Sequence, residues 1–218
     1  MSKRIHAESK VELSPLIARH YDTIMNSITF GKYNRFIQSA IKDMEIQSDD
    51  HILDLGCGTG KNAALMAKTL GEKGKITGID VSPIMGKQFI EKLGADSRFE
   101  FKQKRIDIPF KLEKKYDKVL ISFVIHGLPH EHRLILIQNA YDHLQPGGKL
   151  IILDFAEFDM DKMPSHHRFI FKTVECKYAF DYIKKDWKSI LSEYGFSYFG
   201  EKKYMKKYTR LLSAVRKS

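Results

Sequence analysis

Three glycines alternate with other residues directly after an apolar stretch that is typical of a buried strand. Gly56, Gly58 and Gly60 allow the backbone to turn sharply and to approach a ligand closely. Asp54 places a carboxylate just before them, which favours a ligand with a positively charged end over a pyrophosphate. A dinucleotide-binding fingerprint would also need a glycine at position 61, where this chain has Lys61. A nicotinamide or flavin dinucleotide is therefore disfavoured.

Acidic residues also follow the next two predicted strands. Asp80 ends the second strand, where its carboxylate can accept hydrogen bonds from both hydroxyls of a ribose. The alternative is an aspartate that caps the following helix, although Ser82 can supply that cap. Asp107 follows the third strand and can accept a hydrogen bond from an adenine amino group, with the amide of Ile108 facing the ring. Turn chemistry beside Pro109 is the alternative explanation for Asp107.

S-adenosylmethionine is the cofactor that fits these positions. It carries an ammonium and a sulfonium group, which suit Asp54, together with a ribose and an adenine. Val81, next to the ribose-binding position, and Ser122, at the end of the fourth strand, belong to the same predicted site. Met85 is predicted to pack on the adenine, although a methionine early in an amphipathic helix belongs to the core as often.

The elements that position these residues alternate between strands and helices. The predicted strands are His51–Leu55, Lys75–Ile79, Arg98–Gln103, Asp117–Phe123 and Gly148–Phe155, and helices are predicted at 12–28, 32–45, 61–70, 83–94 and 131–144. This alternation predicts an α/β fold with a mostly parallel sheet that helices cover on both faces. A helix near 185–194 and two strands, Phe196–Phe199 and Tyr208–Val215, follow without a further helix, which predicts an antiparallel pair at the sheet edge.

The length of 218 residues fits a single domain, which we divide into four parts. Residues 1–48 are predicted to form N-terminal helices that act as a lid, and residues 49–155 form the cofactor-binding core. Residues 156–184 are rich in His, Phe, Tyr and Met and are interpreted as a cap over the substrate, with an ordinary surface helix as the alternative. Residues 185–218 supply the C-terminal helix and strands.

Composition limits where the chain works and what it binds. Hydrophobic residues make up 43% of the chain, its longest apolar run is too short to span a bilayer, and its N-terminus lacks the apolar stretch of a signal peptide. Two distant cysteines indicate no disulfide framework, so we expect a cytoplasmic protein. The net charge of +10 comes from lysines spread along the chain. A nucleic-acid partner is therefore disfavoured, peripheral contact with an anionic membrane stays open, and no oligomeric state is indicated.

These motifs resemble those of class I S-adenosylmethionine-dependent methyltransferases, from about Ile17 to Val215. Within that superfamily the chain is most similar to the ubiquinone and menaquinone C-methyltransferase group. The similar segments are Ala18-Arg-His-Tyr-Asp22, Met25-Asn-Ser-Ile-Thr-Phe-Gly31, Tyr116-Asp-Lys-Val-Leu-Ile-Ser-Phe123 and Leu144-Gln-Pro-Gly-Gly-Lys-Leu-Ile-Ile-Leu-Asp-Phe155. The resemblance implies a Rossmann-like, seven-stranded sheet with an antiparallel C-terminal strand and an N-terminal helical lid. It also implies that Tyr21 lies on this lid over the methionine part of the cofactor; the alternative is an aromatic on a buried helix face.

The chain departs from the quinone methyltransferases after the fourth strand. They continue with Gly-Leu-Arg-Asn, whereas this chain reads Val124-Ile-His-Gly127 and has His126 at the arginine position. A histidine there could take the proton of a phenolic hydroxyl or orient an amine or thiol nucleophile, so His126 is the candidate catalytic base. The alternative is a loop or helix-capping histidine. His130 and His132 lie close in sequence, but their spacing does not place all three on one face, and no metal is predicted.

The sequence therefore predicts a methyltransferase with a small-molecule acceptor, and C-methylation of a quinone-type aromatic is the leading hypothesis. N-methylation of a small amine or a phospholipid head group is the first alternative, and it would need acids and aromatic rings facing a cation. RNA methylation is the second, although no added RNA-binding module is visible. The third is a cofactor-binding scaffold without catalysis.

Overall fold

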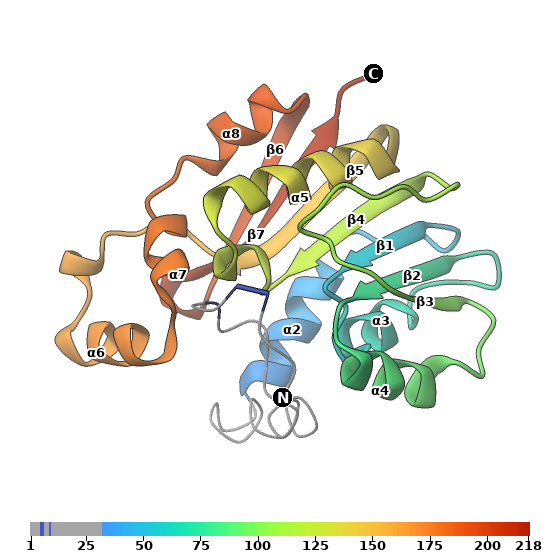
Figure 1. Cartoon of the computed structure of the whole chain (residues 1–218), viewed down its shortest axis with the longest axis horizontal. Coiled ribbons are helices and arrows are strands. Elements are labelled where there is room, and N and C mark those ends of the chain that lie inside the picture. The colour runs from blue at the N-terminus through green and yellow to red at the C-terminus, as the bar shows by residue number, and fades with distance from the viewer. Residues whose placement is uncertain (1–4, 7–8, 10–31) are drawn as a thin grey trace.

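A computed structural model describes residues 5, 6, 9 and 32–218. Seven strands of this part of the chain form one sheet in the order β3-β2-β1-β4-β5-β7-β6 (Figure 1). The strands are β1 (His51–Leu55), β2 (Lys75–Asp80), β3 (Phe99–Gln103), β4 (Tyr116–Ser122), β5 (Leu144–Phe155), β6 (Phe196–Tyr204) and β7 (Thr209–Arg216). Strands β1 to β5 are parallel, and β7 runs antiparallel to both of its neighbours. The predicted mostly parallel sheet and its antiparallel C-terminal strand are confirmed.

Helices cover both faces of this sheet (Figure 1). They are α2 (Lys32–Lys42), α3 (Lys61–Met66), α4 (Pro83–Leu93), α5 (His130–His143), α6 (Ser165–Val174), α7 (Lys177–Tyr182) and α8 (Trp187–Glu193), with the 3-10 turns η1 (Ile125–Gly127), η2 (Met160–Lys162) and η3 (Met205–Lys207). None of the helices in the described part of the chain is long and apolar enough to cross a bilayer. The predicted helix at 12–28 lies outside the described residues.

Alternate side chains of the central strands enter two different cores. Leu53 of β1 packs in the core that contains Leu136 of α5 and Leu191 of α8. Ile52, its neighbour on the strand, packs in the core that contains Ile37 of α2. Because both sheet faces are covered, the central strands are apolar at successive positions. These apolar runs are the pattern from which the strands were predicted.

Most element boundaries differ from the prediction by a few residues, and β6 extends to Tyr204 instead of ending at Phe199. Helix α3 ends at Met66 instead of near residue 70, because the chain continues into a turn in which Thr69 donates its backbone N–H to Met66. Strand β5 begins at Leu144 instead of Gly148, because Leu144 pairs with Tyr116 before a register shift. All of these differences lie at element ends and leave the sheet order unchanged.

The strand order reverses between β1 and β4, which have β2 and β5 as their other neighbours. Ligands of open α/β sheets bind beyond the carboxyl ends of the strands at such a reversal. Asp54 and Ser122 lie at or near these ends of β1 and β4, and Asp80 ends β2. The fold therefore brings most of the residues predicted to bind cofactor to one edge of the sheet.

A buried arginine attaches the segment after β5 to this edge. Arg133 of α5 is fully buried, and its Nη1 donates to Asp181 of α7 at 2.8 Å. Its Nε donates to the carbonyl of Ile125 at 3.1 Å, and its Nη2 donates to the carbonyl of Tyr178 at 2.5 Å. One side chain thus joins α5, η1 and α7. Because a buried cation needs such partners, loss of Arg133 would loosen the packing of α7 on η1.

Candidate active site

The glycine loop after β1 has the backbone that its sequence requires. Gly56, Gly58 and Gly60 have φ angles of 85°, 53° and 77°, in the left-handed region that favours glycine. A Cβ on Gly56 would lie 2.4 Å from Cγ2 of Val124, whereas a Cβ on Gly58 would meet no atom within 4 Å. The loop is therefore packed against the protein at Gly56 and borders open space at Gly58, where a ligand can approach the backbone.

Asp54 is a buried carboxylate without a hydrogen-bond partner among the described residues. Both of its oxygens are unpaired there, although the residue is fully buried. Burial and, after it, the negative charge of Asp80 raise the pKa of Asp54 to about 7. Buried carboxylates are normally paired with a cation or with N–H and O–H donors, because burial without a partner costs free energy. Asp54 thus has the chemistry of a site for a cationic group.

Asp80 joins the glycine loop to the turn that follows β2. Its Oδ2 accepts the backbone N–H of Gly58 at 2.9 Å, and its Oδ1 accepts that of Ser82 at 2.8 Å. Burial raises the pKa of Asp80, and these backbone hydrogen bonds oppose the rise. The hydroxyl of Ser82 caps α4 by accepting the N–H of Met85 at 3.3 Å. Ser82 therefore fills the capping role that was the alternative for Asp80, whose oxygens can each accept a further hydrogen bond.

The other residues predicted to bind cofactor divide into buried and exposed positions. Val81 and Ile108 are apolar side chains with 39% and 40% of their surface exposed. Both lie in segments that follow the carboxyl ends of strands, so they are available to pack on a ligand. Met85 and Ser122 are buried. Tyr21 lies outside the described residues.

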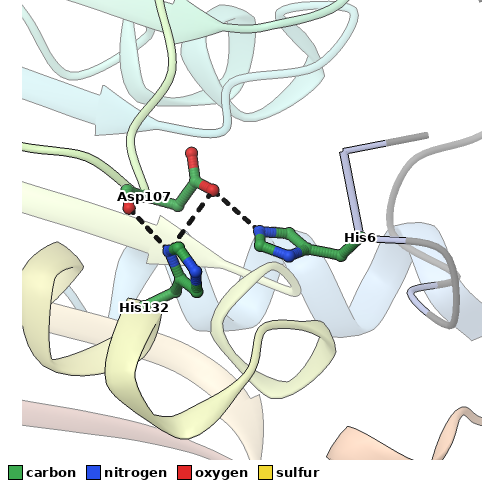
Figure 2. Close-up of side chains that lie close together, drawn as sticks. All are labelled: His6, Asp107 and His132. Carbon is green, nitrogen blue, oxygen red and sulfur yellow. Dashed lines mark hydrogen bonds and ion pairs between the residues drawn. The ribbon is translucent and has the colours of Figure 1, made fainter. Parts of the chain in front are cut away.

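Asp107 is held by a network that includes an N-terminal histidine (Figure 2). Arg105 donates to Oδ1 from Nε at 3.0 Å and to Oδ2 from Nη2 at 2.8 Å. Nε2 of His6 lies 2.8 Å from Oδ2, and Nδ1 of His132 lies 2.9 Å from the Asp107 carbonyl oxygen. Burial alone would raise the pKa of Asp107, but Arg105 and His6 lower it to about 2. Asp107 is thus ionised, and its contacts to Arg105, His6 and His132 were not predicted.

His6, Asp107 and His132 also offer one potential metal-ligand atom each, and these atoms lie within 4.8 Å of one another. Two imidazoles and a carboxylate are ligands that zinc binds. However, the guanidinium of Arg105 already pairs with the carboxylate and would repel a divalent cation. The sequence had suggested weighing His132 with His126 and His130, whereas the structure groups it with His6. The absence of a bound metal therefore stays a prediction, and the group of His6, Asp107 and His132 is the site at which it can be tested.

His126 lies between two carboxylates. Its Nδ1 is 2.8 Å from Oδ1 of Asp154, and its Nε2 is 3.5 Å from Oε2 of Glu175. Burial alone would lower the pKa of His126, but the charge and hydrogen bond of Asp154 and the charge of Glu175 outweigh it and raise the pKa. Asp154 comes from the end of β5 and Glu175 from the residue after α6. The arrangement can orient the ring and stabilise its protonated form.

A connected group of aromatic rings packs beside this histidine. The ring of Phe155 lies 5.0 Å from that of His126, centroid to centroid, and Phe171 of α6 lies 5.1 Å from Phe155. Phe123, which follows β4, lies 6.3 Å from Phe155. The hydroxyl of Ser9 donates to the carbonyl of Gly127 at 2.8 Å, next to His126. The described N-terminal residues His6 and Ser9 thus contact Asp107 and η1, the turn that contains His126.

Sequence reasoning missed the partners of these side chains. Asp154 had a usable signal, because it lies at the carboxyl end of the fifth predicted strand, at the same edge as Asp54 and Asp80. Glu175 had none, since it lies in the segment whose structure was not predicted. Arg133 lies in the helix predicted at 131–144, and its four acceptors, two in η1 and two in α7, were not predicted.

Comparisons with known proteins agree with this fold. Residues 52–148 match the sequence model of a family described as a methyltransferase domain. The chain is 30% identical to the demethylmenaquinone methyltransferase of Lactiplantibacillus plantarum over 147 residues, which cover 66% of this chain and 61% of that protein. It is 26% identical to the same enzyme of Staphylococcus aureus strain JH9, with 72% and 65% covered. The chain thus spans between three fifths and two thirds of the length of these relatives.

Solved structures show the same architecture. A methyltransferase from Aquifex aeolicus, described as SAM-dependent, has a TM-score of 0.61 and 22% identity, with 82% of this chain and 88% of that chain covered. The N-methyltransferase NodS from Bradyrhizobium japonicum, in complex with S-adenosylhomocysteine, has a TM-score of 0.61 and 15% identity, with 87% and 88% covered. At these identities the likeness is one of fold.

The strand order and the match of residues 52–148 resemble those of methyltransferase domains with the class I, Rossmann-like fold. The resemblance predicted from the sequence motifs is therefore confirmed. Among the relatives, the demethylmenaquinone methyltransferases come from the group that the sequence motifs indicated.

Proposed function

We propose that this chain is an S-adenosylmethionine-dependent methyltransferase. The observation that carries the proposal is Asp54, a buried carboxylate without a partner among the described residues, beside a glycine loop that is open at Gly58. S-adenosylmethionine, when bound, supplies a methyl group on a sulfonium that is already activated for displacement. Its ammonium would meet the need of Asp54 for a cation, and the match of residues 52–148 supports the same reading.

The remaining cofactor contacts follow from the sheet edge. Asp80 would hold the ribose hydroxyls while its backbone contacts keep the glycine loop in place. Asp107 would accept from the adenine amino group, with Val81, Met85 and Ile108 packed around the ring. Ser122 would line the site from the end of β4, and Tyr21 would cover the methionine part from the lid. The contacts of His6 and Ser9 support a covering role for residues 1–48.

For the acceptor, we propose a small quinone-type aromatic that is methylated on carbon. The demethylmenaquinone methyltransferases among the relatives support this class. The rings of Phe123, Phe155 and Phe171 lie in one connected group beside His126 and would stack on a planar, apolar acceptor. Residues 156–184 supply Phe171 and Glu175 to this side, so we propose that they form the acceptor cap over the core at 49–155.

His126 is the proposed catalytic base. Its Nδ1 faces Asp154, which fixes the ring and leaves Nε2 as the atom that accepts the proton of an acceptor hydroxyl. Removal of this proton gives electron density to the attacking carbon, while the water-poor surroundings favour displacement over side reactions. Glu175, at 3.5 Å from Nε2, would then stabilise the imidazolium that forms. Asp154 is a positioning residue in this scheme.

The same geometry supports a second candidate, the N-methylation of a small amine. Asp154 and Glu175 are acids beside aromatic rings, which is the environment that a cationic acceptor needs. The two candidate functions predict different methyl acceptors for the purified protein. Demethylmenaquinol and small amines should be compared as acceptors with methyl-labelled S-adenosylmethionine.

The cellular test is a comparison of metabolites in knockout cells, in which we expect a demethylated quinone to accumulate. An unchanged quinone pool would contradict the quinone assignment and favour an amine. Binding of S-adenosylmethionine to the purified chain tests the cofactor separately, because it requires no acceptor. A chain that does not bind S-adenosylmethionine would contradict the proposed function as a whole.

A further inference from the structure

Helix α6 exposes a row of large apolar side chains. Phe169, Ile170 and Val174 have 71%, 56% and 57% of their surface exposed. Ile170 and Val174 are four positions apart and share one side of the helix, and Phe169, one position before Ile170, lies at the edge of that side. Figure 1 shows α6 at the periphery of the molecule, away from the sheet. We refer to these three residues as the α6 face.

The opposite side of α6 forms a wall of the candidate acceptor site. Phe171 is buried and packs 5.1 Å from Phe155 and 5.5 Å from Phe158, centroid to centroid. Phe155 in turn contacts the ring of His126. A single helix therefore has an apolar outer face in solvent and an apolar inner face beside the candidate base.

Positive charge lies around the α6 face. Lys172 is exposed on α6 itself, and Lys206 and Lys207 are exposed in η3. Turn η3 lies near α6, because the hydroxyl of Tyr208, which follows it, is 3.3 Å from Nδ1 of His167. Within the described part of the chain, these three lysines form no ion pair.

The neighbouring acids each face a basic side chain. Asp159 pairs with Lys162, and Asp161 pairs with Arg168. Glu175 pairs with His126. The unpaired charge beside the α6 face is therefore positive, and exposed apolar side chains with a cationic rim are typical of a helix that lies in a membrane interface.

We propose that the α6 face docks this protein on an anionic lipid bilayer. Phe169, Ile170 and Val174 enter the boundary between head groups and acyl chains, and Lys172 and the η3 lysines lie at the lipid phosphates. A second copy of the chain is a poorer occupant, because a symmetric contact would bring two lysine-rimmed faces together. In one respect the inference depends on the proposed function: an apolar quinone acceptor would reach the site along α6 from the bilayer.

Vesicle sedimentation of the full chain tests the docking. We expect binding to vesicles that contain phosphatidylglycerol, weaker binding to pure phosphatidylcholine, and loss of binding at high salt. The double variant Phe169→Ser, Ile170→Ser should bind about tenfold or more weakly, since it removes two apolar anchors. Ile90→Ser is the control, because Ile90 is 55% exposed on α4. Helix α4 lies away from α6 (Figure 1).

Charge is tested in the same way. Lys172→Glu should weaken binding to phosphatidylglycerol vesicles by roughly tenfold or more, because it replaces one attraction with one repulsion. Lys87→Glu on α4 makes the same charge change at an exposed position and should leave binding unchanged. All five substituted side chains are exposed, so the melting temperature should stay near that of the unchanged chain and serves as the folding check.

Two results would overturn the docking. One is a double variant that binds vesicles as tightly as the unchanged chain. The other is a chain that does not bind vesicles but forms a dimer in light scattering, when the double variant is monomeric. The assay contains no S-adenosylmethionine and no acceptor, so its outcome is independent of the methyltransferase assignment. Conversely, a chain that binds vesicles but transfers no methyl group would contradict only the proposed function.

Discussion

Nδ1 of His126 lies 2.8 Å from Oδ1 of Asp154, so a carboxylate at the end of β5 fixes the ring of the candidate base. Asp154 is completely buried and belongs to the same sheet edge as Asp54 and Asp80. The edge that would bind the cofactor therefore also orients the histidine. The proposed cofactor site and the candidate base thus share one edge of the sheet, and the protonation of His126 depends on Asp154.

The pH dependence of methyl transfer should reveal this coupling. Because the pKa of His126 is raised from 6.5, the neutral base forms only above the usual histidine range. We expect the acid limb of kcat/KM to lie above pH 6.5. In Asp154→Asn, burial becomes the dominant effect on the pKa of His126, so the acid limb should move to lower pH. The maximal kcat/KM should also fall, because the imidazole ring is held less firmly. Asp142→Asn, at an exposed acid of α5, is the control. Identical limbs in both variants would remove Asp154 from the mechanism.

Replacement of His126 should separate binding from turnover. His126→Ala removes the base but none of the proposed cofactor contacts. We expect S-adenosylmethionine to bind with unchanged affinity and turnover to fall by about 10²- to 10⁴-fold, the usual contribution of general base catalysis. Calorimetry and a methyl-transfer assay on the same preparation measure the two quantities. Full activity in this variant would show that His126 is a structural histidine.

Binding of the cofactor should release a proton from Asp54. The pKa of Asp54 is raised to about 7 in the free protein, so at pH 6 the carboxyl is mostly protonated. A cationic ligand favours the carboxylate, and the proton then leaves. Calorimetry of S-adenosylmethionine binding in two buffers of different ionisation enthalpy measures this release. Asp54→Asn should abolish the release and weaken binding by roughly 10- to 100-fold, whereas Asp49→Asn should do neither.

The same group should make the free chain less stable as the pH rises. The pKa of Asp54 is higher in the folded chain than its ordinary value of 3.8. Between about pH 4 and pH 7 the unfolded chain has lost a proton that the folded chain keeps, so stability from this group falls across that window. Chemical denaturation measures the free energy of unfolding at pH 5 and at pH 8. The difference between these two values should be smaller for Asp54→Asn than for the unchanged chain. An equal difference would contradict the raised pKa.

The sequence predicted the parts of this molecule whose signals are local. Strand β1 matches its prediction residue for residue, because a buried strand is apolar at successive positions and the glycines after it end the strand. The glycine loop is equally local, since each glycine has a positive φ that its own residue type permits. The positions of Asp54 and Asp80 at one edge followed from the predicted topology, because the carboxyl ends of parallel strands lie at the same edge of a sheet.

The parts that were missed depend on contacts between remote residues. Arg133 and Asp181 are 48 positions apart, and no periodicity links them. His6 reaches Asp107 across 101 positions. Glu175 approaches His126 because α7, which follows it, packs on η1. The segment 156–184 carries no regular pattern that predicts this packing. The candidate base was predictable, whereas the carboxylates that set its protonation were mostly not.

Two neighbouring glycines should respond differently to the same substitution. Gly58→Ala has space for its Cβ, so the cost to folding is about 1–2 kcal/mol from the left-handed backbone. That Cβ would occupy the open space in which we place the cofactor, and binding of S-adenosylmethionine should be lost. Gly56→Ala meets Val124 at 2.4 Å and should cost about 2–4 kcal/mol of stability. Denaturation and calorimetry measure both effects. Unchanged binding by Gly58→Ala would move the cofactor away from this loop.

Removal of metal should leave methyl transfer unchanged. The carboxylate of Asp107 is paired with Arg105, and Nδ1 of His132 faces a carbonyl oxygen, so the group formed with His6 is already satisfied by protein contacts. We expect protein dialysed against EDTA to keep full activity and elemental analysis to find no stoichiometric zinc. His132→Ala is the companion variant: it should alter neither the metal content nor the response to EDTA. Loss of activity on chelation, restored by zinc in the unchanged chain but not in His132→Ala, would assign a metal site to His6, Asp107 and His132.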